Sequence, residues 1–144
     1  MSDVKVSSLS LKTLLVPSKD VTEEYPGMPG FKVKLSYLSR DTLIQLRKKA
    51  TTQKRVKGEL VEEINDELFL DLYVKAAIKG WEGLKLKYLS LLAPVDLEGH
   101  DMENALAYSE ENALFLMKNS TDFDSWVGSV INDLANFQSS KSSS

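Results

Sequence analysis

The sequence predicts an α+β fold, mainly α, in which an N-terminal antiparallel β-pair precedes four or so short helices packed as one small domain. The stretch FKVKLSY at 31–37 alternates apolar and polar residues with the period of a strand. Several later stretches repeat apolar residues at helical spacing. The chain has 144 residues, 42% hydrophobic and 27% charged, which is typical of one globular domain.

The β-pair is predicted from the alternation and from the nearest earlier apolar run. Phe31, Val33, Leu35 and Tyr37 share one face of the expected strand. The expected partner strand is Leu11 to Val16, which ends at a proline, and the long segment PSKDVTEEYPGMPG is expected to be an irregular loop. We therefore expect a flexible N-terminus at 1–10 and a single domain at 11–137, with the β-pair at about 11–37 and the helical part at about 39–137.

Two helices are predicted next. Ser39 is an N-cap candidate, and the helix should span about Arg40 to Ala50. The basic segment TTQKRVKGE is expected to be a loop with a turn at Gly58. Asn65 or Asp66 should cap the second helix. The residues expected to be buried on the two helices are Leu43, Ile44 and Leu46, then Leu68, Phe69, Leu72, Tyr73, Ala76 and Ala77.

Trp81 lies between two glycines, Gly80 and Gly83, where the second helix is expected to end. Gly80 is the predicted terminator, because glycine adopts the left-handed conformation that closes helices. We expect Trp81 to fold back over the second helix and the last helix as part of the core. The alternative is an exposed side chain that contacts a partner.

The C-terminal half is predicted to be helical. LKLKYLSLL should form a short helix ended by Pro94, residues 95–108 a loop, and Ser109 should cap the next helix. Ser120 or Thr121 should cap the last helix, and residues 138–144 are expected to form a Ser-rich flexible tail. The apolar residues of the last helix recur at i, i+3, i+4 and i+7: Phe123, Trp126, Val127, Val130, Ile131, Leu134 and Phe137.

The net charge of −3 is unevenly distributed. Residues 1–57 contain twelve basic and five acidic residues, a net charge of +7, whereas residues 58–144 contain six basic and sixteen acidic residues, a net charge of −10. One interpretation is that the two parts neutralise each other within the fold. The other is that the asymmetry orients head-to-tail self-association into a homo-oligomer.

No group of residues predicts catalysis, a metal or a cofactor. The chain contains no cysteine and one histidine, His100, in a polar loop. Paired acids such as Asp66/Glu67 and Glu110/Glu111 lie in predicted first turns of helices, where acids stabilise the helix. The basic cluster from Arg47 to Lys57 lacks interleaved aromatic residues, so nucleic-acid binding is not the favoured interpretation. We also expect neither a membrane span nor a signal peptide.

The remaining candidates are aromatic side chains, which are favoured anchors at protein interfaces. Each of them is also a candidate core residue, and the sequence leaves both interpretations open. The candidate partner-binding residues are Phe69, Tyr73, Trp81, Tyr88, Phe115, Trp126 and Phe137.

Three segments in a fixed order carry a resemblance to a known family: IKGWEGL at 78–84, YSEENAL at 108–114 and FDSWV at 123–127. Over residues 31–137 the chain resembles the tail assembly chaperones of long-tailed bacteriophages. The resemblance implies a non-enzymatic protein of the host cytoplasm, absent from the mature virion. Such a protein coats the tape measure protein until the tail tube protein polymerises around it.

The resemblance also implies that a longer form of the protein could arise by ribosomal frameshifting near the segment QSSKSSS. The main alternative is a structural tail component, a connector or completion protein, that stays in the virion. A small regulator that binds nucleic acid through the basic segment is the second alternative.

Overall fold

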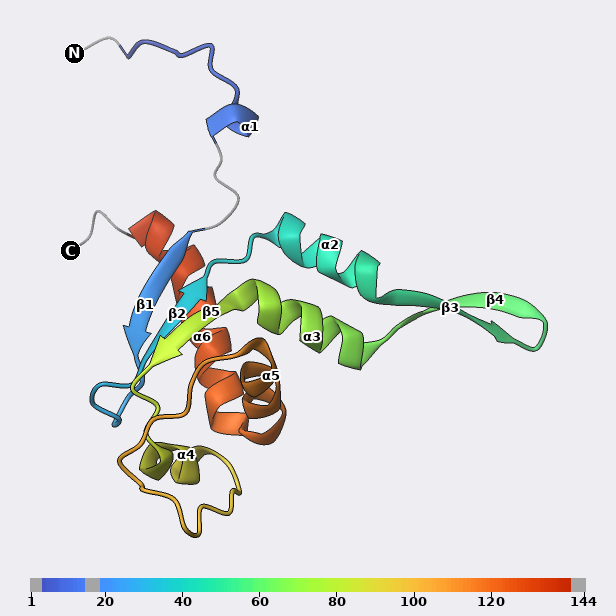
Figure 1. Cartoon of the computed structure of the whole chain (residues 1–144). Coiled ribbons are helices and arrows are strands. Elements are labelled where there is room, and N and C mark those ends of the chain that lie inside the picture. The colour runs from blue at the N-terminus through green and yellow to red at the C-terminus, as the bar shows by residue number, and fades with distance from the viewer. Residues whose placement is uncertain (1–3, 15–18, 141–144) are drawn as a thin grey trace.

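The computed structural model describes residues 4–14 and 19–140; for residues 134–140 the description covers the backbone alone. The described residues form a small α+β domain with an N-terminal strand pair, which confirms the predicted fold class. Figure 1 shows a body, built from a sheet and helices, and a long arm that extends away from it.

The sheet of the body has three antiparallel strands in the order β1-β2-β5: β1 (Asp20–Glu24), β2 (Lys32–Ser36) and β5 (Ile78–Glu82). β2 is the predicted strand, and its Val33 and Leu35 are fully buried while Lys32 and Lys34 are exposed. This pattern is expected of a sheet with one solvated face.

The predicted partner strand at Leu11 to Val16 is wrong. Leu11–Leu14 form a short exposed helix, α1, and residues 15–18 lie outside the described residues. The partner of β2 is β1, whose sequence DVTEE is polar. Because β1 is an edge strand with mostly exposed side chains, it carries little of the apolar signal on which the prediction relied.

The arm is a β-hairpin that continues two helices of the body. α2 (Arg40–Ala50) passes directly into β3 (Thr51–Val56), and β4 (Glu59–Ile64) leads through Asn65 into α3 (Asp66–Ala77). Ser39 and Asn65 accept hydrogen bonds at the starts of the two helices, as predicted. The turn predicted at Gly58 is confirmed, but the loop expected for the rest of TTQKRVKGE is wrong, because residues 51–56 form the first strand of this hairpin.

The prediction that Gly80 ends the second helix is also wrong. α3 ends at Ala77, and Ile78 immediately begins β5. A register shift opposite Lys34 and Leu35 brings Leu35 opposite Ile78 and Val33 opposite Trp81. Such an irregularity allows two residues three positions apart to face the same side of a sheet. On α3, Val74, which the predicted stripe omitted, is 1% exposed.

The remaining helices pack against the body. They are α4 (Leu86–Leu92), α5 (Glu110–Asn119) and α6 (Thr121–Ser140), and the predicted caps Ser109 and Ser120 accept hydrogen bonds from the first turns of α5 and α6. The helix α6 includes the first residues of the predicted C-terminal tail, while residues 141–144 lie outside the described part of the chain. Phe123 and Val127 of α6 are fully buried in the core.

Candidate protein-binding surface

Trp81 is a half-buried part of the body, in a strand rather than at a helix end. Its indole lies edge-on to Phe123 of α6, with 6.4 Å between ring centres, and edge-on to Tyr108 at 5.1 Å. Its Nε1 donates a hydrogen bond of 3.0 Å to the Leu106 carbonyl oxygen. The expected packing against the last helix is therefore present, and the indole also anchors the loop that follows α4.

Four other candidate aromatic side chains are partly buried against the core. The Tyr88 hydroxyl donates to the Pro29 carbonyl oxygen at 2.8 Å, and the Trp126 ring lies 4.9 Å from that of Tyr25. Phe69 and Tyr73 stack on each other along α3 at 6.3 Å. Burial, and secondarily the charge of Asp124, raises the pKa of Tyr73. These contacts give each side chain a structural role.

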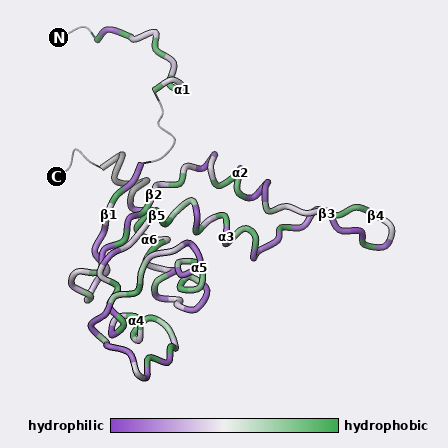
Figure 2. Tube along the Cα trace, viewed as in Figure 1, coloured by the Kyte–Doolittle hydropathy of each residue, from purple (hydrophilic) through white to green (hydrophobic). Residues whose placement is uncertain are grey.

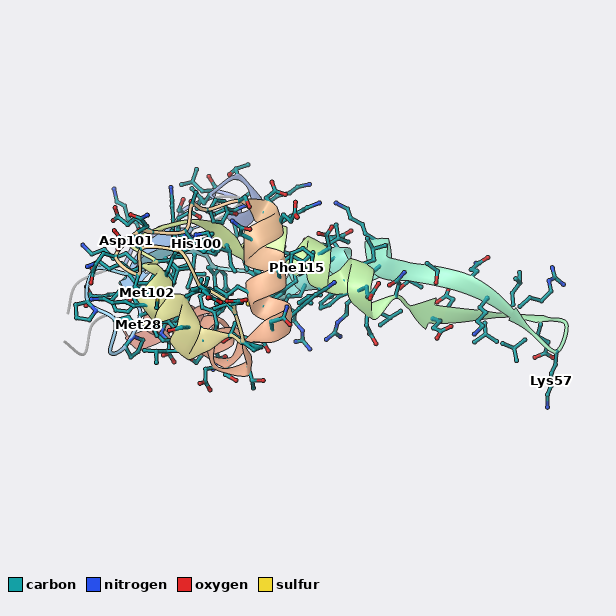
Figure 3. All side chains as sticks on the ribbon, turned by 60° about the horizontal axis from the view of Figure 1, so that its bottom comes forward. Met28, Lys57, His100, Asp101, Met102 and Phe115 are labelled. Atoms are coloured by element: carbon teal, nitrogen blue, oxygen red, sulfur yellow. The ribbon has the colours of Figure 1, made fainter. Side chains whose placement is uncertain are left out.

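Phe115 differs from the others because 52% of its surface is exposed. It lies on the outward side of α5, whose inward side buries Ala113, Leu116 and Met117. Figure 3 shows Phe115 on this helix, on the surface of the body. The Lys118 ammonium lies 5.9 Å from the centre of its ring. The last candidate, Phe137, belongs to the part of α6 whose side chains are not described.

Phe115 borders a pocket of about 290 Å³ between α4, the segment that follows it, and α5. The Asn112 amide nitrogen donates to the Ala107 carbonyl oxygen at 3.0 Å, and that of Asn119 donates to the Phe115 carbonyl oxygen at 2.9 Å. These two amides are thus partly satisfied within the chain, and the other lining side chains are apolar. The lining residues are Leu89, Ala93, Pro94, Val95, Leu106, Asn112, Phe115, Leu116 and Asn119.

The aliphatic part of this surface was not predicted from the sequence. Val95 lines the pocket and is 41% exposed, and Leu91 on α4 is 71% exposed. A signal for Phe115 was present: on a helical wheel it lies opposite Ala113 and Met117, two apolar residues of the same helix. Leu91 and Val95 had no comparable signal, because isolated apolar residues on a surface are common.

The arm is a second exposed surface. Every residue of β4, and every residue of β3 after Thr51, is exposed. The boundary between the basic and acidic parts of the sequence falls at the Lys57–Gly58 turn, at the tip of the arm (Figure 3). Within the arm, the basic strand β3 and the acidic strand β4 are therefore neighbours.

The residues considered for chemistry lie apart from one another. His100 is exposed in the loop after α4, and the paired acids of α3, α5 and α6 lie in first helical turns, as predicted. In the described parts of the chain, no three His, Asp or Glu side chains are grouped so that they could hold a metal ion. No helix within those same ranges is long and apolar enough to cross a membrane.

Comparison with known proteins places the chain in a phage context. The family model described as YdaY prophage protein matches residues 37–144, three quarters of the chain, from the end of β2 through the arm to the C-terminus. The searches of curated proteins and of solved structures found no match. On the basis of the family match, the chain belongs to the YdaY prophage protein family.

Proposed function

We propose that this phage protein is a tail assembly chaperone that binds an amphipathic helical segment of the tape measure protein. The observation that carries the proposal is the apolar pocket beside Phe115, because it is a preformed concave site next to an exposed aromatic anchor. The phage family and the resemblance of three segments to tail assembly chaperones support it. The proposed role involves no catalytic step.

The size and lining of the pocket favour a protein side chain as its occupant. Pockets for small molecules usually measure about 300–1,000 Å³ and enclose most of their ligand. This pocket, at about 290 Å³, lies at the lower end of that range and has mainly apolar walls. An apolar side chain from one face of a client helix suits such a site, with further contacts to Phe115 and Val95.

The proposed binding should be weak for each copy. One pocket and one half-exposed aromatic ring provide a small interface, and small interfaces are typical of transient complexes. A tape measure protein with many amphipathic segments would bind many copies, so that the coat as a whole is stable. The tail tube protein could then displace the copies one by one, in the host cytoplasm, leaving none in the finished virion.

Co-expression with the tape measure protein of the same phage tests the proposal. We expect the chaperone to raise the soluble fraction of the client and to co-purify with it. Phe115→Ala should weaken this binding about tenfold or more, because exposed aromatic anchors contribute most at interfaces. The matched control is Met102→Ala, which removes a 39% exposed apolar side chain outside the pocket and should leave binding unchanged. A client that stays soluble alone and never co-purifies would refute the proposal.

The alternative of a structural tail component predicts a different location. Mass spectrometry of purified phage particles should find no copies if the protein is a chaperone and a fixed number if it is a connector or completion protein. The nucleic-acid alternative is weakened by the arm itself, since the basic residues of β3 lie beside the acidic residues of β4, and Lys54 lies 3.9 Å from the Glu63 carboxylate.

A further inference from the structure

The arm combines full exposure with open backbone edges. Its two strands, β3 and β4, pair only with each other in the described structure. An isolated two-stranded hairpin is only marginally stable in water, and an unpaired strand edge is a template for pairing with another strand. The arm also exposes apolar side chains without a covering element, with Leu60 62% and Ile64 46% exposed. These features indicate a strand edge available to a partner.

The hydrogen bonds at the base of the hairpin identify which residues face the outer edge of β3. Asn65 N–H donates to the Ala50 carbonyl oxygen at 2.8 Å, which makes these two residues a bonded pair of the hairpin register. Bonded and non-bonded pairs alternate along an antiparallel ladder. It follows that Thr51, Gln53 and Arg55 direct their backbone N–H and C=O groups away from β4.

The strand β1 is an outer strand of the sheet in the body, and its hydrogen bonds likewise identify its outward-facing residues. Tyr37 N–H donates to the Lys19 carbonyl oxygen at 2.8 Å, and Tyr25 N–H donates to the Phe31 carbonyl oxygen at 2.9 Å. These bonded pairs flank β1 in register with its pairing to β2. The outward-facing backbone groups of β1 therefore belong to the alternate positions, which are Asp20, Thr22 and Glu24.

The two open edges have opposite charge. The strand β3 and its turn carry Lys54, Arg55 and Lys57, whereas β1 carries Asp20, Glu23 and Glu24. Opposite charges across paired strands stabilise the pairing, and like charges destabilise it. Two copies of β3 would bring together two strands of the same positive charge, so self-pairing of the arm along this edge is disfavoured. The acidic edge of β1 is the complementary surface.

We propose that the β3 edge of one copy pairs with the β1 edge of a second copy and extends its sheet. In an antiparallel register that matches the outward-facing groups of both strands, Arg55 lies opposite Asp20 and Gln53 lies opposite Thr22. Lys54 is then diagonal to Glu23. The contact joins the arm of one copy to the body of the next, so the two surfaces in contact differ. Such a head-to-tail contact generates a ring or an open chain. In this assembly, copies of the chain contact one another in the absence of the client.

Charge reversal tests the pairing of the two edges. Sedimentation velocity of the wild-type chain at low salt should show association that increases with concentration and is lost at high salt, because exposed charges are screened. Reversing the charge of the three basic residues of the arm, Lys54, Arg55 and Lys57, should leave a folded monomer. Reversing the three acidic residues of β1 by Asp20→Lys, Glu23→Lys and Glu24→Lys should do the same. A mixture of the two variants should associate again, because each arm then meets a β1 edge of opposite charge. A wild-type chain that stays monomeric at low salt would overturn the proposal.

Cysteine cross-linking gives a second test that is independent of charge. The chain has no cysteine, so introduced thiols are the only ones present. In the proposed register, Thr52 lies opposite Glu23 in a non-bonded pair, where Cα atoms are close enough for a disulfide. Mixing Thr52→Cys with Glu23→Cys under mild oxidation should give a covalent dimer of the two variants. The control Glu62→Cys, on the other strand of the arm, should not cross-link to Glu23→Cys. Equal cross-linking of both would refute the register.

Discussion

The strands β2 and β4 are both short and antiparallel, yet they lie in opposite surroundings. In the body, Val33 and Leu35 of β2 are 0% exposed and are covered by helices. In the arm, every residue of β4 is exposed, and 62% of the surface of Leu60 is accessible to solvent. Figure 2 shows apolar and polar residues mixed along the arm. The body is therefore stabilised by burial of apolar surface, whereas the arm depends on its backbone ladder and its turn.

Two glycines, one in each region, provide the largest expected contrast. Gly83 follows β5 with φ +72°, and a Cβ there would collide with the Gly30 carbonyl oxygen in the loop between β1 and β2. Gly83→Ala should destabilise the fold by about 3 kcal/mol or more, since backbone strain adds to overpacking. Urea denaturation measures the loss as a lower midpoint at an unchanged slope.

The arm supplies the matched control. Gly58 has φ +83°, but a Cβ there would meet nothing within 4 Å. Gly58→Ala strains the turn, whose two central residues both have positive φ, as a type I′ hairpin turn requires. Because the arm contributes little to the packing of the body, the urea midpoint should change far less than for Gly83→Ala. Equal losses for the two variants would contradict the division into body and arm.

Substitutions of Trp81 test how much a half-buried aromatic side chain stabilises the body. Trp81→Ala removes an indole that contacts Phe31, Phe123 and Tyr108, so we expect a loss of about 3 kcal/mol, at the low end of the range for fully buried tryptophans. Trp81→Phe keeps much of the packing and loses the hydrogen bond to the Leu106 carbonyl oxygen, which should cost about 1 kcal/mol beyond the change in ring size. Thermal melting of both variants checks that Trp81→Ala lowers the melting temperature more than Trp81→Phe does. An unchanged melting temperature for Trp81→Ala together with lost client binding would mean that the side chain serves a partner.

The sequence predicted those parts of the fold whose signals are local. Ser39, Asn65 and Ser109 mark helix starts because a side-chain cap acts on the next few backbone N–H groups. The strand β2 was predictable because burial of one face imposes alternation on its sequence. Where no burial occurs, as in β1 and the arm, the sequence carries no such alternation, and both were missed.

From the sequence, the candidate site could be predicted only as a group of aromatic residues, without a distinction between core and surface positions. Aromatic side chains that fill a core and those that contact a partner have the same chemistry, so the sequence grouped Phe115 with Trp81 and Tyr88. Their separation depends on long-range contacts, such as the one between Tyr88 and Pro29, which are 59 residues apart. The pocket likewise depends on the placement of Val95 and Leu106 beside α5, which no local pattern specifies.

The smallest expected effect concerns the largely exposed loop after α4. Glu103 forms ion pairs with Lys87 at 2.8 Å and Lys85 at 3.0 Å. The pKa of the Glu103 carboxyl is held below its usual value by hydrogen bonds from these two ammonium groups. The bond from Lys87 has the larger effect. A carboxyl group with a lower pKa in the folded state stabilises the fold above its unfolded pKa, and this contribution is lost as the pH falls through the folded pKa.

Glu103→Gln should therefore lower stability slightly at neutral pH and have no effect once the pH is low enough to protonate the wild-type carboxyl group. Chemical denaturation of both proteins across this acidic range measures the difference, and NMR titration of the wild type gives the pKa directly. The difference should also shrink in high salt, because Glu103 keeps 59% of its side-chain surface exposed and its pairs are screened. A difference that persists at low pH would show that Glu103 acts through packing of the loop rather than through its charge.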